Sequence, residues 1–565
     1  MISNPSTPTV RWGRDLAVLA LLFGLLYLFQ LGSAPLGEPD EGRYAEIPRE
    51  MVATGDWVTP RLDGVNYFEK PPLVYWMTAS CLEIFGGSEW SLRLPPALFG
   101  IGGVMLTYAA GRRLYGRRAG MMAAVALGTS ALYFGLARIL VLDGAVAVLM
   151  SAALFCFILG IREEPGRRRR WLFYGLYASS ALATMTKGPI GFLVTGAVMF
   201  FWLLILGRWK RLRPLHLPSG ILIFLAIALP WHLLAASRNP SWAHFYFIHE
   251  NWERFTTTEH QRTGPWWYFV PIVLLGLFPW TGFLWGALRE KLAGGWARRG
   301  ENAEAWFLAI WTAFIFLFFS ASQSKLPGYI LPVFPPLAVL IGAGLADATL
   351  KKGAALRAGL WGFVGLAGLL GAAALAIATN PHLLHDPAQG MALQPHAWCL
   401  AAILLAGGLV VALMTRAGRG SMGRGHTAIF GLLVVTVLFL FGLSSARPLI
   451  QRPSTKELAL HVKALAAPGD EIVHYHAFFR DFTFYAGREA DLAAYKDELE
   501  PENDPSAAAQ SHFISEAEFR RRWAGSGRVF AVAKKDEIRE LLADPAFHYR
   551  LLEETRGHYL IVNQP

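Results

Sequence analysis

The sequence has few charged residues and few cysteines for its length. Charged residues make up 16% of its 565 positions, whereas ordinary globular chains carry about 25%. Several soluble domains could not be covered with so little charge, so a mostly soluble protein is excluded. The three cysteines, Cys81, Cys156 and Cys399, lie in apolar stretches without CxxC or Cys/His spacing. A disulfide framework and a structural zinc site are therefore not expected.

Several common motifs are also missing. The sequence has no GxxxxGK[ST] loop, no GxSxG elbow and no kinase signature, which argues against ATP-driven transport, serine-hydrolase chemistry and kinase chemistry by this chain. The first apolar run, Leu16 to Leu31, follows Arg11 and Arg14 and precedes no convincing small-residue cleavage site. We therefore expect a retained first span rather than a cleaved signal peptide.

Long hydrophobic runs take the place of charge, and hydrophobic residues make up 54% of the chain. Fourteen segments approach the about 20 apolar residues that a spanning helix needs. They are 15–31, 71–86, 90–110, 118–136, 138–161, 171–186, 188–206, 219–236, 266–288, 305–320, 328–346, 357–378, 398–415 and 427–445. If all fourteen cross, the basic loops at 112–118 and 167–170 and every later basic loop fall outside, against the positive-inside rule.

Removing one early span places all these loops correctly. The segment 71–86 is short, opens with Pro71-Pro72 and carries Glu83, so we expect it to lie on the outer membrane surface. The prediction is a polytopic α-helical membrane protein with about 13 transmembrane helices, its N-terminus inside and its C-terminus outside. In a bacterium this is the inner membrane, with the outer side facing the periplasm.

The division of charge supports two domains. The formal charge is +11, yet residues from Arg447 onward hold 16 basic and 19 acidic residues, which leaves 36 basic and 22 acidic residues before them. The excess follows topology, so no nucleic-acid partner is expected. We predict a transmembrane catalytic domain over 1–446, with a first periplasmic loop at 32–89, and a periplasmic α/β domain over 447–565. Strands are expected at 471–476, 528–533 and 559–562, and helices at 455–466 and 535–543.

The first outer loop carries an acidic motif, Glu38-Pro-Asp-Glu-Gly-Arg-Tyr-Ala-Glu46, directly after the first span. Asp40 and Glu41 could serve acid/base chemistry or bind a cation near the membrane surface. The alternative is that Asp40 caps the helix that follows it, with Glu41 and Arg43 in the first turn. The two roles do not exclude each other.

Two further charged residues stand at the outer ends of spans. Asp143 is an acid at the membrane boundary, which is costly and usually functional or paired, and Arg138 is one candidate partner. Lys187 lies in an outer turn, where the positive-inside rule disfavours a lysine. An anionic ligand would explain Lys187, and so would snorkelling of its amine to the interface.

Further outer residues extend this set. His249, Glu250 and Arg254 lie close together at 247–255, and Lys325 and Tyr329 follow in Ser324-Lys-Leu-Pro-Gly-Tyr329. His249 with Glu250 is a weak metal signal, whereas Arg254 offers a bidentate fork for phosphate. The outer cations Lys70, Lys187, Arg254 and Lys325 could together hold phosphates near carboxylates.

These motifs resemble one known family. The combination of Asp40-Glu-Gly-Arg-Tyr-Ala-Glu46, Tyr67-Phe-Glu-Lys-Pro-Pro-Leu73, an outer Asp143, Thr186-Lys-Gly-Pro189 and Ser324-Lys-Leu-Pro-Gly-Tyr329 resembles the bacterial 4-amino-4-deoxy-L-arabinose transferases of lipid A. That family has the polytopic glycosyltransferase C fold and is related to protein O-mannosyltransferases. The resemblance implies transfer of the sugar from undecaprenyl phosphate to a lipid A phosphate, with inversion. The product carries a cationic sugar, which reduces attraction of polymyxin and similar peptides.

The resemblance also implies roles for single residues. Asp40 matches the family's catalytic carboxylate. Arg43, Lys70, Lys187, Arg254 and Lys325 are candidates to stabilise the leaving phosphate, where charge develops. The implied substrate pocket adds Glu41, Tyr44, Tyr67, Glu69, Asp143, Glu250 and Tyr329, in which a carboxylate suits the sugar's ammonium group. No cofactor is assigned, although Glu69 with His249 is a candidate pair for a divalent metal.

Two other functions fit the same sequence. A protein O-mannosyltransferase-like enzyme would use a polyprenyl-linked sugar but a protein acceptor. A lipid flippase or transporter would suit many spans and cationic cavities. The odd number of spans, the lack of visible inverted repeats and the confinement of unusual polar residues to one face favour the enzyme.

Overall fold

The computed structural model describes residues 9–240, 242, 246, 264–351, 354–384, 386–417, 422–451, 453–495, 499 and 506–564. The chain divides into two compact units. The first comprises Met1–Leu31, Pro96–Pro230 and Asn251–Ile450, and the second comprises Gly32–Pro95, Trp231–Glu250 and Gln451–Pro565. The second unit thus groups the first outer loop with the C-terminal domain, and the domain boundary at 446/447 stays a prediction.

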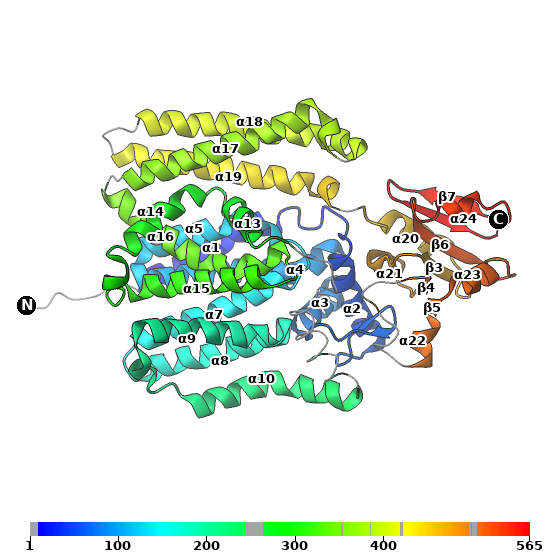
Figure 1. Ribbon diagram of the computed structural model, residues 1–565, viewed down its shortest axis with the longest axis horizontal. Helices are drawn as coiled ribbons and strands as arrows, with labels where there is room; N and C mark the ends of the chain where they lie inside the picture. Colours follow the sequence, from blue (N-terminus) through cyan, green and yellow to red (C-terminus); the bar gives the residue numbers. More distant parts are fainter. Residues whose placement is uncertain are drawn as a thin grey trace, which may run out of the picture. The chain divides into compact units, whose positions relative to one another are not determined.

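The first unit consists of helices (Figure 1). Those lying wholly or largely in it are α1 (Thr9–Leu28), α4 (Glu89–Tyr115), α5 (Arg117–Gly128), α6 (Ala131–Leu136), α7 (Asp143–Arg162), α8 (Arg167–Lys187), α9 (Ile190–Leu206), α10 (Leu217–Arg238), α13 (Phe269–Gly276), α14 (Thr281–Lys291), α15 (Ala303–Ala321), α16 (Phe334–Lys351), α17 (Ala354–Thr379), α18 (Pro387–Ala417) and α19 (Met422–Ile450). Short 3₁₀ helices are η1 (Trp209–Leu212), η3 (Gly295–Arg298), η4 (Pro327–Val333) and η5 (Pro381–Leu383).

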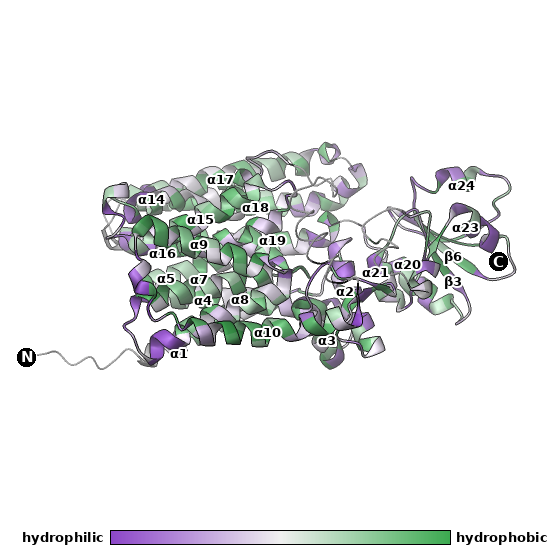
Figure 2. Cartoon of the chain, turned by 60° about the horizontal axis from the view of Figure 1, so that its bottom comes forward, coloured by the Kyte–Doolittle hydropathy of each residue, from purple (hydrophilic) through white to green (hydrophobic). Residues whose placement is uncertain are grey.

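These helices are apolar enough to make a multi-pass membrane protein. Within the described residues, eight helices are long and apolar enough to cross a membrane, or nine if the bent pair α13 and α14 forms one span. Figure 2 shows hydrophobic residues along the helices of this unit. Each of the thirteen predicted spans falls on a helix or a broken helix, but the count of thirteen crossings stays a prediction.

The interior and the periphery of this unit differ in burial. The apolar window of α7 is 78% buried and that of η4 with α16 is 94% buried, whereas the windows of α10, α17 and α18 are 22–28% buried. A helix that is apolar on all sides either lies in a protein core or faces lipid. Helices α7 and α16 therefore form the core, and α17, α18 and α19 lie side by side with apolar surface exposed (Figure 1).

Two segments that the sequence presents as continuous are broken. Residues 118–136 divide into α5 and α6, where the Thr129 and Ser130 hydroxyls donate to the carbonyls of Val125 and Ala126. Hydroxyls that bond to the preceding turn often bend helices. Residues 266–288 divide into α13 and α14, which meet at an angle of 98°. Pro279 lies in the break, because proline cannot supply a helical N–H.

The outer loop of the second unit begins with two helices, α2 (Asp40–Thr54) and α3 (Leu73–Phe85). With 13 residues, α3 extends about 20 Å, which is shorter than the about 30 Å hydrocarbon core of a bilayer. That length agrees with a surface position for 71–86. Between the two helices, β1 (Arg61–Leu62) and β2 (Val65–Asn66) pair as an antiparallel hairpin. Asp63 and Gly64 both have positive φ there, as a tight hairpin turn requires.

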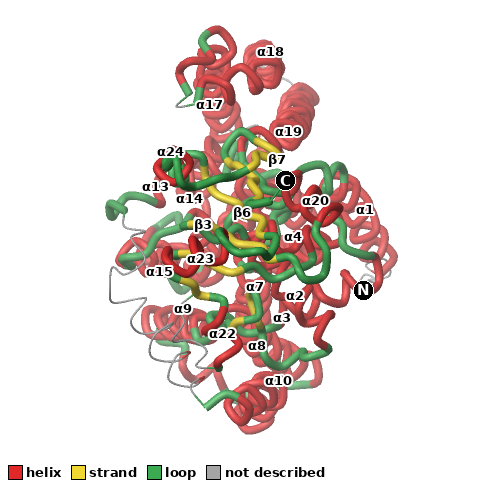
Figure 3. The backbone as a smooth tube through the Cα atoms, turned by 90° about the vertical axis from the view of Figure 1, so that its right-hand side faces the viewer, coloured by secondary structure: helices red, strands yellow, loops and turns green. Residues whose placement is uncertain are grey.

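The C-terminal residues form an α/β domain around a six-stranded sheet (Figure 3). Its elements are α20 (Lys456–Leu465), β3 (Glu471–Tyr475), α21 (Arg480–Ala486), β4 (Asp491–Ala493), α22 (Ala507–Ser511), β5 (Phe513–Ile514), α23 (Glu516–Trp523), β6 (Val529–Lys534), α24 (Arg539–Ala543), β7 (Arg550–Glu554) and β8 (His558–Val562). The strand order is β5-β4-β3-β6-β8-β7, with β5, β4, β3 and β6 parallel. The structure confirms the predicted α/β class of this domain and the predicted elements β3, β6, β8 and α20. Helix α24 is shorter than expected.

Side-chain alternation gives the sheet two covered faces. On one face, Val473 of β3 and Ala531 of β6 pack with Phe519 and Trp523 of α23. Neighbouring residues on a strand point to opposite faces, so His474 lies on the other face, where its ring contacts Phe482 of α21. Helices α23 and α21 therefore cover opposite faces of the sheet.

Candidate active site

Asp40 is the first residue of α2, and it is not the helix cap. Pro39 occupies the cap position, and no side-chain cap hydrogen bond is present there. The prediction that Asp40 caps this helix is therefore wrong, although its charge suits the positive end of the helix dipole. The side chain is 45% exposed, and its Oδ1 lies 3.9 Å from Nη1 of Arg43. An accessible carboxylate beside a guanidinium is available to a substrate.

Arg43 lies buried between aromatic rings one turn after Asp40. Its side chain is 3% exposed, and its guanidinium carbon lies 5.7 Å from the ring centre of Tyr67 and 6.0 Å from that of Tyr44. Tyr44 in turn packs against Tyr75 of α3, with ring centres 6.0 Å apart. Aromatic ring faces attract a cation and so stabilise its charge where it is partly removed from water. Arg43 therefore presents a fixed positive charge close to Asp40.

Glu69 and Lys70 belong to the same cluster. The amine of Lys70 donates to the carbonyl of Glu69 at 2.9 Å and lies 3.8 Å from the Glu69 carboxylate. Burial raises the pKa of Tyr44 well above its usual value, and the charges of Asp40 and Glu69 act in the same direction. Apart from Glu41, the predicted residues of the first loop thus meet in one cluster, to which the structure adds Tyr75.

Glu41, in contrast, is engaged inside the protein. Its two carboxylate oxygens accept hydrogen bonds from Nε and Nη2 of Arg93, both at 2.8 Å. Arg93 also donates to the carbonyls of Ala34 and Pro35, and both charged side chains are buried. The pair fixes the start of the outer loop against α4. Sequence spacing gave no sign of this, because 52 positions separate the partners.

The C-terminal domain contacts the acidic motif directly. The carboxylate of partly buried Glu38 accepts a hydrogen bond from the backbone N–H of Asp481 at 2.6 Å and lies 3.9 Å from Arg480. Burial, and then the Asp481 carboxylate, raise the pKa of Glu38 to about 8. A Cβ on Gly42 would lie 2.3 Å from Glu38 Oε1 and 2.5 Å from Asp481 N. Only glycine fits at position 42 while this contact is made.

Asp143 and Lys187 form an ion pair in the first unit. Nζ of Lys187, the last residue of α8, lies 2.5 Å from Oδ1 of Asp143, the first residue of α7, and each side chain is 17% exposed. The same amine lies 4.3 Å from the ring centre of Tyr329. Arg138, the partner suggested by sequence, donates to the carbonyls of Leu26 and Phe29. Lys187 therefore contacts a carboxylate and an aromatic face.

The glycine of the Ser324-Lys-Leu-Pro-Gly-Tyr329 motif has a steric explanation. A Cβ on Gly328 would lie 2.7 Å from Cγ of Asp143, so a larger residue would displace the carboxylate. Lys325 is buried, and its amine donates to the carbonyl of Ser322. The motif thus places Tyr329 beside the Asp143–Lys187 pair and holds Lys325 in the loop between α15 and η4.

Three predicted residues, His249, Glu250 and Arg254, lie outside the described residues. The candidate metal pair of Glu69 and His249 therefore stays a prediction. Across the part of the chain that the structure describes, no group of three or more His, Cys, Asp and Glu side chains could hold a metal ion.

The chain is similar to proteins of one family along most of its length. A family model for dolichyl-phosphate-mannose-protein mannosyltransferase matches residues 69–233. The undecaprenyl phosphate-α-4-amino-4-deoxy-L-arabinose arabinosyl transferase of Edwardsiella ictaluri is 36% identical over 365 residues, 64% of this chain and 65% of that relative. The protein of the same name from Pectobacterium atrosepticum is 35% identical over 385 residues, 66% of this chain and 67% of the relative. The match thus spans just under two thirds of the Edwardsiella protein's length.

A solved structure extends the similarity to nearly the whole chain. The crystal structure of ArnT from Cupriavidus metallidurans bound to undecaprenyl phosphate superposes with a TM-score of 0.81 at 30% identity, covering 99% of each chain. The chain belongs to the undecaprenyl phosphate-aminoarabinose arabinosyl transferase family. Membership in this arabinosyl transferase family confirms the predicted glycosyltransferase C fold and the class of enzyme, a glycosyltransferase in the membrane. The roles of single residues in this chain remain predictions.

Proposed function

We propose that this protein transfers 4-amino-4-deoxy-L-arabinose from undecaprenyl phosphate to a phosphate of lipid A, at the periplasmic face of the bacterial inner membrane. The observation that carries the proposal is the similarity to ArnT bound to undecaprenyl phosphate over 99% of both chains. The added sugar carries an ammonium group and reduces the net negative charge of lipid A. Weaker attraction of polymyxin and other cationic peptides follows.

In the proposed reaction, an oxygen of the lipid A phosphate attacks the anomeric carbon of the sugar with inversion. The bond between that carbon and the undecaprenyl phosphate oxygen breaks, and undecaprenyl phosphate leaves with the electron pair. A phosphate monoester has a second pKa near 6, so the nucleophile needs little deprotonation at neutral pH. Asp40 is therefore proposed to orient the acceptor or to bind a cation rather than to act as a simple base.

Negative charge develops on the leaving phosphate, and fixed cations stabilise it. In the second unit, Arg43 lies beside Asp40 and Lys70 lies beside Glu69, and both residues are candidates to supply this positive charge. In the first unit, Lys187 and Lys325 are the candidates. Arg254 lies outside the described residues and stays a candidate because of its position in the sequence. A guanidinium offers a bidentate contact to phosphate, whereas an ammonium acts as a point charge.

Tyrosines and carboxylates are the candidates to bind the sugar. Tyr44 and Tyr67 lie against Arg43, and Glu69 lies beside Lys70, so an aromatic surface stands next to a carboxylate. That combination suits a sugar with an ammonium group. Asp143 and Tyr329 offer the same chemistry, and Glu250 is retained from the sequence. Glu41 is assigned to support of the loop, since Arg93 engages its carboxylate.

The test is Asp40→Asn in a strain whose own transferase is deleted, with mass spectrometry of lipid A. We expect transfer to fall by about 10²-fold or more, while the unfolding temperature in detergent stays unchanged. Glu83→Gln is the matched control, because it removes an exposed carboxylate from the same outer loop. Normal transfer by Asp40→Asn would remove Asp40 from the mechanism.

The acceptor is tested separately in the same strain. If sugar appears on periplasmic proteins and not on lipid A, the protein O-mannosyltransferase-like alternative replaces the lipid A assignment. If neither is modified while undecaprenyl-linked sugar crosses the membrane of reconstituted vesicles, the transporter alternative replaces the transferase.

A further inference from the structure

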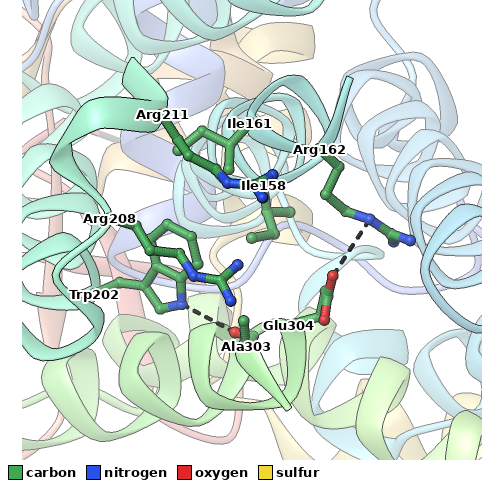
Figure 4. A pocket seen from close by; sticks show the side chains of 8 residues that line it. All are labelled: Ile158, Ile161, Arg162, Trp202, Arg208, Arg211, Ala303 and Glu304. Atoms are coloured by element: carbon green, nitrogen blue, oxygen red, sulfur yellow. Dashed lines mark hydrogen bonds and ion pairs between the residues drawn. The ribbon is translucent and has the colours of Figure 1, made fainter. Parts of the chain in front are cut away.

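A polar pocket lies in the first unit, built by the ends of four helices (Figure 4). It has a volume of about 240 Å³ and is lined by Arg162 at the end of α7, Trp202 of α9, Arg208 and Arg211 around η1, and Glu304 at the start of α15. We call it the arginine pocket. Sites for drug-sized ligands occupy about 300–1,000 Å³, so this pocket fits a headgroup-sized ligand.

The arginine pocket carries an unbalanced positive charge. Nε of Arg162 lies 3.3 Å from Oε1 of Glu304, so that carboxylate offsets one arginine. Arg208 donates to the carbonyl of Gly300 at 2.6 Å, which leaves its charge in place. No carboxylate in the described part of the chain pairs with Arg208 or Arg211. Figure 4 shows both guanidinium groups directed into the space between the helices.

This pocket is remote from the Asp143–Lys187 pair of the same unit. Helix α7 begins at Asp143 and ends at Arg162, and its 20 residues rise about 30 Å, close to the thickness of the hydrocarbon core. The arginine pocket therefore lies at the opposite end of α7 from the Asp143–Lys187 pair. It also lies among the basic loops that the positive-inside rule assigns to the cytoplasmic side.

Apolar surface adjoins the pocket on α9 and η1. Phe200, Leu204 and Trp209 are 49%, 54% and 43% exposed, and the rings of Phe200 and Trp209 lie 5.7 Å apart. In a membrane-spanning unit such side chains face lipid, and tryptophan is typical of the interface. A ligand with a phosphate in the pocket could extend acyl chains along this surface.

We propose that the arginine pocket binds the phosphate of an anionic membrane lipid in the leaflet opposite the Asp143–Lys187 pair. Two guanidinium groups without a carboxylate partner match the charge and the oxygen geometry of a phosphodiester. Basic pockets between membrane helices are suited to lipid headgroups. The positive-inside rule alone would not explain this pocket. That rule requires positive charge near the membrane, but it requires neither a cavity nor convergent guanidinium groups.

The test uses the full-length protein, delipidated in detergent and then mixed with defined lipids. Native mass spectrometry measures the lipid retained, and thermal unfolding measures the shift on binding. We expect phosphatidylglycerol to be retained and to raise the unfolding temperature, and phosphatidylethanolamine to do so much less. Inorganic phosphate at millimolar concentration distinguishes a soluble ligand: a full shift with phosphate alone would overturn the assignment to a lipid.

Variants decide whether this pocket is the site. Arg208→Gln with Arg211→Gln should lose at least half of the retained phosphatidylglycerol, whereas Lys210→Gln, a charge lost from η1 outside the pocket lining, should not. If the glutamine variant fails to fold, Arg208→Lys with Arg211→Lys keeps the topology charges and should still lose retention. Glu304→Gln should increase retention, because it removes the opposing charge. Wild-type retention by the arginine variants would overturn the proposal.

Discussion

The carboxylate of Glu38 accepts a hydrogen bond from the backbone N–H of Asp481 at 2.6 Å, across 443 positions of the chain. Glu38 lies two residues before Asp40, so the C-terminal domain holds the segment that carries the proposed catalytic carboxylate. The carboxylate of Asp481 is fixed in turn by Ser454 and Thr455. The C-terminal domain therefore contributes to the geometry of the outer loop.

The pH dependence of stability should reflect the raised pKa of Glu38. Its pKa is about 8 in the folded protein, against an ordinary value of 4.5. Between these values the folded state holds a proton that the unfolded state has lost. This contribution to stability is complete below pH 4.5 and is lost as the pH rises through 8. The slope reaches about 1.4 kcal/mol per pH unit for one group.

Glu38→Gln should therefore flatten the fall of the unfolding temperature between pH 5 and 8, measured by thermal unfolding in detergent. Some slope should remain, because burial also raises the pKa of Glu50 to about 8. An unchanged pH profile in Glu38→Gln would mean that Glu38 is ionised in the folded protein.

Gly42→Ala should disrupt the contact between α2 and the C-terminal domain. Alanine in place of glycine inside a helix normally stabilises by about 1 kcal/mol, but here the added carbon would clash with Glu38 and Asp481. Overpacking of this kind costs about 1–3 kcal/mol. We expect a lower unfolding temperature and reduced transfer to lipid A. Gly102→Ala is the control, since nothing lies within 4 Å of the added carbon there; equal behaviour of the two variants would contradict the clash.

The Asp143–Lys187 pair can be tested by exchanging its charges. Lys187→Met should destabilise the protein by about 1.5–3 kcal/mol, the usual contribution of a charged hydrogen bond. The double variant Asp143→Lys with Lys187→Asp restores opposite charges at the same place. If the pair takes part in the reaction, the double variant should regain the unfolding temperature but not transfer. Recovery of both would assign the pair a structural role alone.

Removal of Arg93 should reveal the free-energy cost of burying the Glu41 carboxylate without its arginine partner. Arg93→Met leaves Glu41 without its bidentate partner, and breaking such a buried pair costs about 3–5 kcal/mol. Arg93→Met with Glu41→Met should recover much of that loss, because no buried charge then remains. Denaturation of the two single variants and the double variant gives the coupling energy. Additive effects would show that the two side chains do not depend on each other.

The sequence determined the class of the molecule because membrane helices and buried strands depend on local properties. The apolar runs that become α7 and α16 satisfy their backbone hydrogen bonds within a segment, so length and composition are sufficient. The central strands β3, β6 and β8 are short apolar runs that read as buried. The shorter strands β4 and β5 carry too few residues for such a pattern; β4 forms because β3 offers a partner, and β5 forms because β4 does.

Sequence motifs likewise identified Asp40, Arg43, Glu69 and Lys70 as candidate site residues. The motifs did not indicate which side chains surround them. Tertiary structure alone decided that Lys187 pairs with Asp143, that Arg93 engages Glu41 and that Asp481 holds Glu38. These partners lie 44, 52 and 443 positions apart, and no local preference encodes such a pairing. Each depends on packing that removes both groups from water, so that each needs the other as its hydrogen-bonding partner.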